Sequence, residues 1–155
     1  MQACEYTNDT YTDNATGYCV RQCTNGTFAD PSTKRCVDVC PDQPLMYAEN
    51  TTLTCVAVCP DNTFGENKTR ICVAACPSGS LSYTQNKLCV FECPIGYYAY
   101  IPTQFCESQC PQPYYGDPST RTCVLTCPIN QLLYADNVSR TCVSNCPSGS
   151  YAYQW

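Results

Sequence analysis

Hydrophobic positions recur along the chain at a fixed distance after a cysteine, and in most units a tyrosine follows two residues later. The first set comprises Phe28, Leu45, Phe64, Leu81, Tyr98, Tyr115, Leu132 and Tyr151, and the second comprises Tyr11, Tyr47, Tyr83, Tyr100, Tyr134 and Tyr153. Residues two apart on a β-strand share a face, so the pattern predicts one short strand per unit with a small apolar face. Polar segments that suit hairpin turns follow, for example Asp30-Pro31-Ser32-Thr33, Gly65-Glu66-Asn67-Lys68 and Asp117-Pro118-Ser119-Thr120.

The cysteines make the chain a tandem repeat. Seventeen of the 155 residues are cysteine, and the steps between them alternate between four and either thirteen or fifteen residues. Most short steps read Cys-Val-x-x-Cys, and only Glu107 replaces the valine. This period predicts one continuous repeat array over 1–155. Its units are approximately 4–22, 23–39, 40–58, 59–75, 76–92, 93–109, 110–126, 127–145 and a truncated 146–155.

Disulfide pairing follows from loop length. Closing a three-residue gap removes little chain entropy and strains the bridge, whereas a loop of about 15 residues contributes roughly 3 kcal/mol. The longer loops are therefore favoured, although bridges that interleave neighbouring units stay open as an alternative. The favoured pairs are Cys4–Cys19, Cys23–Cys36, Cys40–Cys55, Cys59–Cys72, Cys76–Cys89, Cys93–Cys106, Cys110–Cys123 and Cys127–Cys142.

Several features predict that the array belongs to a longer protein. Cys146 is left over, and its expected partner falls just past Trp155. Residues 27–59 align without gaps onto 114–146, an offset of 87 residues or five units, which indicates growth by duplication. The start, Met1-Gln2-Ala3-Cys4, lacks the basic and apolar regions of a signal peptide, so we expect the targeting signal to lie elsewhere.

Composition predicts an oxidising, extracellular compartment or the cell surface. A chain with one cysteine in about nine residues is a disulfide scaffold, and reducing conditions would leave it unfolded. Sequons for N-glycosylation agree with the secretory route, and we expect covalent glycans at several of them. They begin at Asn8, Asn14, Asn25, Asn50, Asn67 and Asn137.

The net charge of the chain indicates which classes of binding partner are unsuitable. The net charge is −5, with no histidine and no basic cluster, so nucleic acid and anionic membrane surfaces are unsuitable. No stretch approaches the roughly 20 apolar residues of a membrane span. We expect self-association or contacts with other extracellular proteins.

Candidate chemistry is sparse. Without histidine, no Cys/His pair or His general base can be assembled, and the acidic residues follow the pattern of solvated turns, so no enzymatic activity is expected. Zinc knuckles favour Cys-x2-Cys, whereas the short step here is x3. The acidic segment from Asp9 to Asp13 lacks a complete calcium loop. We therefore predict no catalytic residue, no metal and no cofactor other than the glycans.

The tyrosines have two interpretations. Exposed aromatic faces stack on sugars, which would make the array a carbohydrate binder. Rings at a fixed register are more typical of packing, in which each covers a disulfide and contacts the next unit. We favour packing for most of them, with a minority of the second set exposed.

The motifs Cys-Pro-x-Gly-Tyr-Tyr at 93–98 and Cys-Val-x-x-Cys-Pro resemble the furin-like, growth-factor-receptor cysteine-rich repeats. Arrays of this kind are also similar to cysteine-rich surface proteins of ciliates and other protists. The resemblance covers nearly the whole chain and implies β-finger hairpins closed by one disulfide and stacked end to end. The two-bridge modules and globular ligand-binding domains of receptor ectodomains are missing.

The sequence thus predicts a small disulfide-rich all-β fold, in which tandem single-disulfide β-hairpin modules stack into an elongated, solenoid-like rod. The module recurs in spacers, receptor arms and coats, so it specifies fold better than function. The leading hypothesis is a structural component of an extracellular filament, surface coat or appendage. The alternative is the stalk or ectodomain of a receptor or adhesin that binds a protein or glycan.

Overall fold

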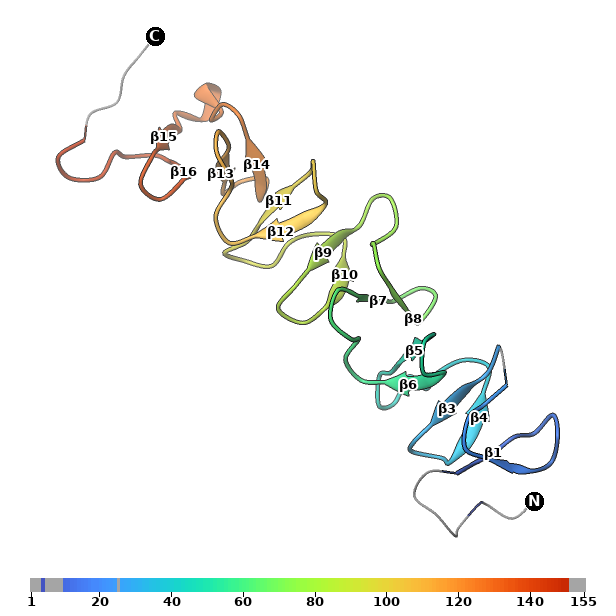
Figure 1. The fold of residues 1–155 in the computed structure, drawn as a ribbon. Helices are drawn as coiled ribbons and strands as arrows, with labels where there is room; N and C mark the ends of the chain where they lie inside the picture. The colour runs from blue at the N-terminus through green and yellow to red at the C-terminus, as the bar shows by residue number, and fades with distance from the viewer. Residues whose placement is uncertain (1–3, 5–9, 25, 151–155) are drawn as a thin grey trace. The chain divides into compact units, whose positions relative to one another are not determined.

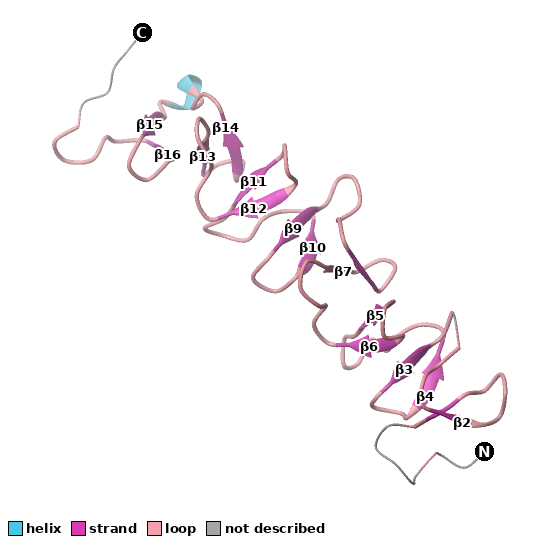
Figure 2. Ribbon diagram, in the orientation of Figure 1, coloured by secondary structure: helices cyan, strands magenta, loops and turns pink. Residues whose placement is uncertain are grey.

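The structure is a computed structural model, and it describes residue 4, residues 10–24 and residues 26–150 (Figure 1). In that part of the chain the secondary structure is sixteen short β-strands and one 3-10 helical turn, η1 (Ile129–Gln131) (Figure 2). None of the helical structure described there is long and apolar enough to cross a membrane.

Each repeat supplies two strands of two or three residues. They are β1 (Tyr11–Thr12) and β2 (Cys19–Val20), β3 (Phe28–Asp30) and β4 (Arg35–Val37), β5 (Tyr47–Glu49) and β6 (Thr54–Val56), β7 (Phe64–Glu66) and β8 (Ile71–Val73), β9 (Leu81–Tyr83) and β10 (Leu88–Val90), β11 (Tyr98–Tyr100) and β12 (Phe105–Glu107), β13 (Tyr115–Asp117) and β14 (Thr122–Val124), and β15 (Tyr134–Asp136) and β16 (Thr141–Val143). The predicted all-β fold of tandem hairpins, each with a disulfide, is confirmed.

The chain divides into two compact units, the first covering 1–76 and 85–89 and the second 77–84 and 90–155. Within each unit, hairpins pair antiparallel, and the first strand of one repeat pairs parallel with the second strand of the next. The strand order is β10-β7-β8-β5-β6-β3-β4-β1-β2 in the first unit and β15-β16-β13-β14-β11-β12-β9 in the second. Successive repeats are therefore joined by backbone hydrogen bonds as well as by the covalent chain.

One disulfide closes each repeat across its own loop. The bridges are Cys4–Cys19, Cys23–Cys36, Cys40–Cys55, Cys59–Cys72, Cys76–Cys89, Cys93–Cys106, Cys110–Cys123 and Cys127–Cys142, with Cα–Cα distances of 5.5–5.8 Å. These are the pairs that the loop-length argument favours. Cys146 is half-buried and unpaired within the chain.

The predicted alignment of the hydrophobic positions is wrong in the repeats with fifteen-residue loops. Leu45 and Leu132 were assigned to strands, yet both lie outside them and are 47% and 68% exposed. The two extra residues are accommodated before the first strand, by a turn between the bridged residues Asp42 and Leu45 in one repeat and by η1 in another. Tyr47 and Tyr134 consequently begin β5 and β15, in the place that Phe28 holds in β3.

The predicted turns are also displaced. Asp30 and Asp117 end β3 and β13, so those two turns begin one residue later than predicted. Gly65 and Glu66 belong to β7, and the turn occupies 67–70. The strand continues into this polar segment because Glu66 pairs with Ile71 across the hairpin.

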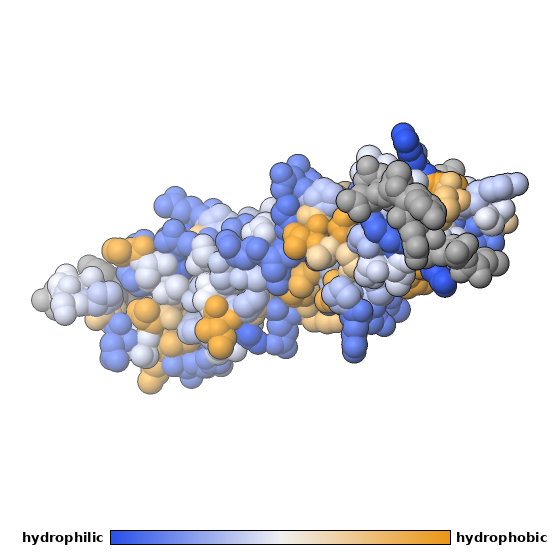
Figure 3. Space-filling view, turned by 90° about the horizontal axis from the view of Figure 1, so that it is seen from below, coloured by the Kyte–Doolittle hydropathy of each residue, from blue (hydrophilic) through white to orange (hydrophobic). Residues whose placement is uncertain are grey.

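Burial is divided among small clusters. Cysteines make up most of the buried hydrophobic residues, and a typical cluster contains Phe28, Met46 and Ala48 with two half-cystines. Large hydrophobic side chains such as Val39, Val58 and Phe91 are exposed. On the face seen in Figure 3, hydrophobic residues form small groups between hydrophilic ones. A repeat with so little core depends on its bridge and on its neighbours.

Removing one bridge tests this dependence. The double variant Cys110→Ser/Cys123→Ser loses the closure of a loop with a sequence separation of 13 residues, worth about 3 kcal/mol. Because contacts are mainly between adjacent repeats, we expect limited proteolysis under non-reducing conditions to cleave first between 110 and 126. Mass spectrometry of the fragments, with the parent chain as control, locates the cuts. Simultaneous cleavage of distant repeats would contradict local closure.

Candidate functional site at the junction between repeats

The junction between successive repeats is built on a small residue in the middle of each first strand. The column reads Thr12, Ala29, Ala48, Gly65, Ser82, Ala99, Gly116 and Ala135. Within each unit, the first residue of the preceding repeat's strand packs onto it, as Phe28 does with Ala48 and Tyr11 with Ala29.

Two of these contacts are close enough to require glycine. A Cβ added to Gly65 would lie 2.7 Å from the Tyr47 ring, and one added to Gly116 would lie 2.6 Å from the Tyr98 ring. Tyr47 is only 1% exposed as a result. The tyrosines of the first strand position therefore cover the neighbouring backbone, as the packing interpretation predicts.

The same small residue donates the hydrogen bond that joins the repeats. Its N–H bonds the carbonyl of the residue just before the next repeat's second strand, at 2.7–2.9 Å. The seven pairs are Thr12–Lys34, Ala29–Leu53, Ala48–Arg70, Gly65–Lys87, Ser82–Gln104, Ala99–Arg121 and Gly116–Arg140.

Each acceptor residue has the left-handed backbone conformation, with φ between 53° and 61°, although none is glycine. A side chain in that conformation costs roughly 1–2 kcal/mol, so these side chains are expected to make compensating contacts. Several place a cation near the preceding ring, as Arg140 does over Tyr115 at 4.4 Å and Lys34 over Tyr11 at 5.4 Å. Leu53 instead packs with the Phe28 cluster.

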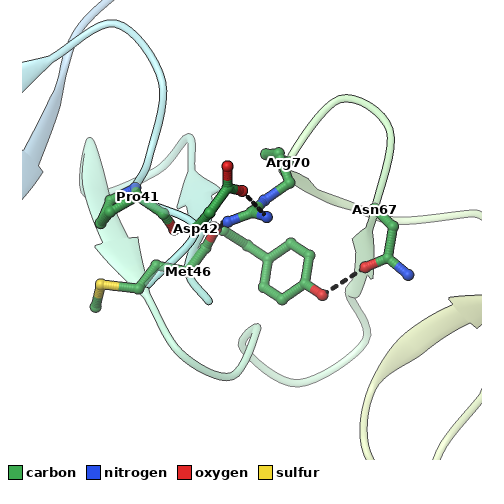
Figure 4. A network of polar contacts seen from close by, with 6 residues as sticks. Pro41, Asp42, Met46, Asn67 and Arg70 are labelled. Atoms are coloured by element: carbon green, nitrogen blue, oxygen red, sulfur yellow. Dashed lines mark hydrogen bonds and ion pairs between the residues drawn. The ribbon is translucent and has the colours of Figure 1, made fainter. Parts of the chain in front are cut away.

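Arg70 illustrates the contacts at one junction (Figure 4). Its Nη2 donates to the carbonyls of Pro41 and Met46 at 2.6 and 2.8 Å, and its Nη1 pairs with Asp42 at 2.5 Å. The guanidinium carbon lies 5.4 Å from the centre of the Tyr47 ring. One side chain thus satisfies two carbonyls of the preceding repeat and flanks its buried ring.

Two sequon asparagines belong to these junctions. The hydroxyl of Tyr47 donates to Asn67 Oδ1 at 2.7 Å, and that of Tyr115 donates to Asn137 Oδ1 at 2.6 Å. In both cases the amide oxygen faces the preceding repeat, while the asparagine itself is exposed. Asn14 and Asn50 are exposed in turns of the first unit, and Asn8 and Asn25 lie outside the described residues.

An acid stands at the end of the first strand in most repeats. Asp13 directly follows β1, and the acids that end their strands are Asp30, Glu49, Glu66, Asp117 and Asp136. The expectation that acidic residues are solvated is wrong for most of these; Asp30 and Asp117, for example, are each 1% exposed. The carboxylate of Asp30 accepts from the Ser32 N–H at 2.9 Å and from the Thr33 hydroxyl at 2.6 Å. It therefore replaces the hydrogen bonds that the turn backbone would otherwise make to water.

These hydrogen bonds favour the ionised form of Asp30, Glu49 and Glu66. Burial alone raises the pKa of Asp30, but bonds from Thr33 and Ser32 outweigh it, and the pKa is lowered. Burial likewise opposes the bonds from Thr52 and Thr51 to Glu49, and the net result is a pKa of about 2, below the ordinary 4.5. The Thr69 hydroxyl is the main cause of the lowered pKa of Glu66.

Tyrosine replaces the acid in the two repeats that contain Tyr83 and Tyr100. Each ring meets a tyrosine of the following repeat edge to face, Tyr83 with Tyr97 at 5.0 Å and Tyr100 with Tyr114 at 5.1 Å. All four are half-buried. The predicted second set of tyrosines therefore contains two structural classes, those that begin the first strand, such as Tyr47, and those that end it, Tyr83 and Tyr100. Tyr151 and Tyr153 lie outside the described residues.

Metal ligands do not gather in the described part of the chain: no three His, Cys, Asp or Glu side chains there are placed to hold an ion. Asp13 accepts from the Ala15 N–H in its own turn at 2.9 Å, and Asp9 lies outside the described residues.

Sequence reasoning missed the small-residue column and the strand-end acids. Both are visible in hindsight when the repeats are aligned on the closing cysteine, because the column then stands opposite it in every hairpin whose register is described. Examples are Ala29 with Cys36 and Gly116 with Cys123. Alignment on the opening cysteine shifted the repeats with long loops by two residues and concealed both patterns.

Comparison with known protein families, with curated proteins and with solved structures finds no match to this chain. The fold and the junctions therefore define it as an array of disulfide-closed β-hairpin repeats.

The glycine at the Tyr47 junction provides a reciprocal test. We expect Gly65→Ala to lower stability by about 1–3 kcal/mol, because the new Cβ overlaps the Tyr47 ring. The double variant Gly65→Ala/Tyr47→Leu should recover part of this loss, since Leu81 packs on Ala99 in the same arrangement. Thermal unfolding of the parent chain, the single variant and the double variant measures the effect. Gly79→Ala is a separate comparison, because Gly79 has φ +86 and open space around it, so its loss of stability reports backbone strain without a clash. Equal midpoints for Gly65→Ala and the parent would contradict close packing.

Because the pKa values of several strand-end carboxylates are lowered, we expect the chain to lose stability at low pH. Glu49 has a pKa of about 2 in the folded chain and an ordinary value of 4.5, so the folded state favours the carboxylate. Its contribution is complete above pH 4.5 and is lost as the pH falls from there to about 2. We expect the thermal midpoint of the parent chain to fall over that window, and the midpoint of the Glu49→Gln variant to fall less. Asp38→Asn, at an exposed position, is the control, and a flat profile between pH 5 and 2.5 would refute the prediction.

Proposed function

We propose that the chain is a structural segment of an extracellular filament, surface coat or appendage, glycosylated at its turns and built like the furin-like cysteine-rich repeats that it resembles. The observation that carries this proposal is the recurrence of one junction. Seven times the same N–H bonds the same left-handed residue of the next repeat.

Such recurrence supports a structural role because it presents equivalent surfaces at regular spacing. Identical patches at even intervals favour repeated lateral or end-to-end contacts. The duplicated block of 87 residues adds a longer period to the same surface. The eight disulfides support an oxidising, extracellular location.

A non-catalytic role agrees with the chemistry of the side chains. The sequence has no histidine to act as a general base. Four of the buried strand-end acids accept turn hydrogen bonds with both carboxylate oxygens, as Asp117 does from Ser119 and Thr120. The other three are Asp30, Glu49 and Glu66. Their lowered pKa is the opposite of what a general acid at neutral pH requires.

Electron microscopy of native, unreduced material at the cell surface or in the medium tests the proposal. At roughly 10 Å per module, about one sheet-packing distance, the duplicated block predicts an axial repeat near 50 Å or a multiple of it. We expect regular fibres or sheets with that spacing, and we expect a reducing agent to abolish them. Isolated molecules anchored to a membrane would overturn the structural proposal and favour a receptor or adhesin stalk.

A further inference from the structure

One junction of the second unit differs from the others because the residue that begins the first strand, Leu81, is not aromatic. Where the third and fourth repeats contribute Tyr47, Gly65 and Arg70, the fifth and sixth contribute Leu81, Ala99 and Gln104. A ring, a glycine and a cation are thus replaced by a shorter aliphatic side chain, an alanine and an amide. The joining hydrogen bond is kept, from the Ser82 N–H to the Gln104 carbonyl at 2.7 Å.

A hollow of about 440 Å³ lies at this junction, and Leu81, Ala99 and Gln104 all line it. Leu81 and Ala99 are buried and belong to one apolar cluster with Cys93. The volume lies within the range of ordinary ligand pockets, which is roughly 300–1,000 Å³. The junction therefore has an apolar floor at the position that Tyr47 and Arg70 occupy between the third and fourth repeats.

The walls of this groove are amphipathic. Phe91 lines it and is 84% exposed, so its ring is not used in packing. Arg121 also lines it, pairs with Glu92 and donates to the Cys93 carbonyl at 2.9 Å. Because the two charges neutralise each other, the groove offers planar polar groups without net charge.

Backbone edges are not offered to a ligand here. The Ser82 N–H is bonded to Gln104 and the Ala99 N–H to Arg121, both within the array. A peptide that binds by adding a strand needs such groups unpaired. The combination of an aromatic face, an apolar floor and neutral polar groups instead suits a ring that is apolar on its faces and polar at its edge.

We propose that this groove is a binding site for a neutral saccharide, in which a pyranose ring fills the space that a tyrosine ring fills at the Tyr47 junction. The apolar face of the sugar lies against Phe91 and Leu81. Its hydroxyls bond Gln104 and the paired Glu92 and Arg121. This site is separate from the filament role and does not depend on it.

Titration of the full chain with cellotriose, chitotriose, mannotriose and galactotriose, followed by NMR chemical shifts, tests the proposal. We expect at least one trisaccharide to shift the signals of Phe91 and Ile101, which both line the groove. Phe91→Ala should weaken that binding by roughly tenfold, the equivalent of one stacked ring. The matched control is Leu125→Ala, because Leu125 is exposed at the same step of a later repeat and should leave affinity unchanged.

A variant that fills the groove distinguishes loss of the binding site from unfolding of the chain. Leu81→Tyr/Ala99→Gly/Gln104→Arg restores the combination found at the Tyr47 junction and should abolish binding without lowering the thermal midpoint. Unchanged affinity in this variant would overturn the proposal, as would the absence of binding by all four trisaccharides. Binding of N-acetyltyrosinamide in place of the sugars would also overturn it and assign the groove to a protein partner.

Discussion

The disulfide that closes each hairpin is the constraint on which the other contacts depend. Strands of two or three residues form too few hydrogen bonds to hold an isolated hairpin in water. With the loop closed at a Cα–Cα distance near 5.6 Å, the middle residue of the first strand is fixed opposite the closing cysteine. Only then can its N–H be aimed at the next repeat and its small side chain present a surface on which a ring packs.

Junctions convert closed hairpins into an array. The residue before each second strand accepts the joining hydrogen bond only in the left-handed conformation. Glycine would adopt it at lower cost, yet the positions hold residues such as Arg70 and Leu53, whose side chains satisfy carbonyls or pack with a ring of the preceding repeat. Backbone strain at the turn is thus offset by contacts in the neighbour, so each repeat is most stable beside the next one. Within each unit, stability is accordingly a property of adjacent pairs.

A regular array makes its exceptions informative. Tyr83 and Tyr100 replace the strand-end acid and exchange a turn cap for contact with the next repeat. Leu81 and Gln104 stand where the Tyr47 junction has a ring and a cation, and both line a groove beside the exposed Phe91. Departures from a local rule without a stabilising compensation are typical of functional sites. The structural role and the saccharide site that we propose are compatible in one protein.

The sequence by itself determined the repeat and the all-β fold and favoured the longer loops over closure of the Cys-x3-Cys step, because cysteine spacing is periodic and a short loop gains little entropy. The structure then excluded the interleaved bridges that the sequence left open. It placed the sequons at exposed turns such as those of Asn50 and Asn67. Tertiary structure alone decided the register of the long-loop repeats, since the two extra residues could lie before or after the strand, and Leu45 and Tyr47 compete for one place. It also decided that acids such as Asp30 are buried, because a carboxylate at the end of a strand reaches turn N–H groups only when the hairpin has closed. The groove beside Phe91 depends on three repeats meeting, and no single repeat encodes it.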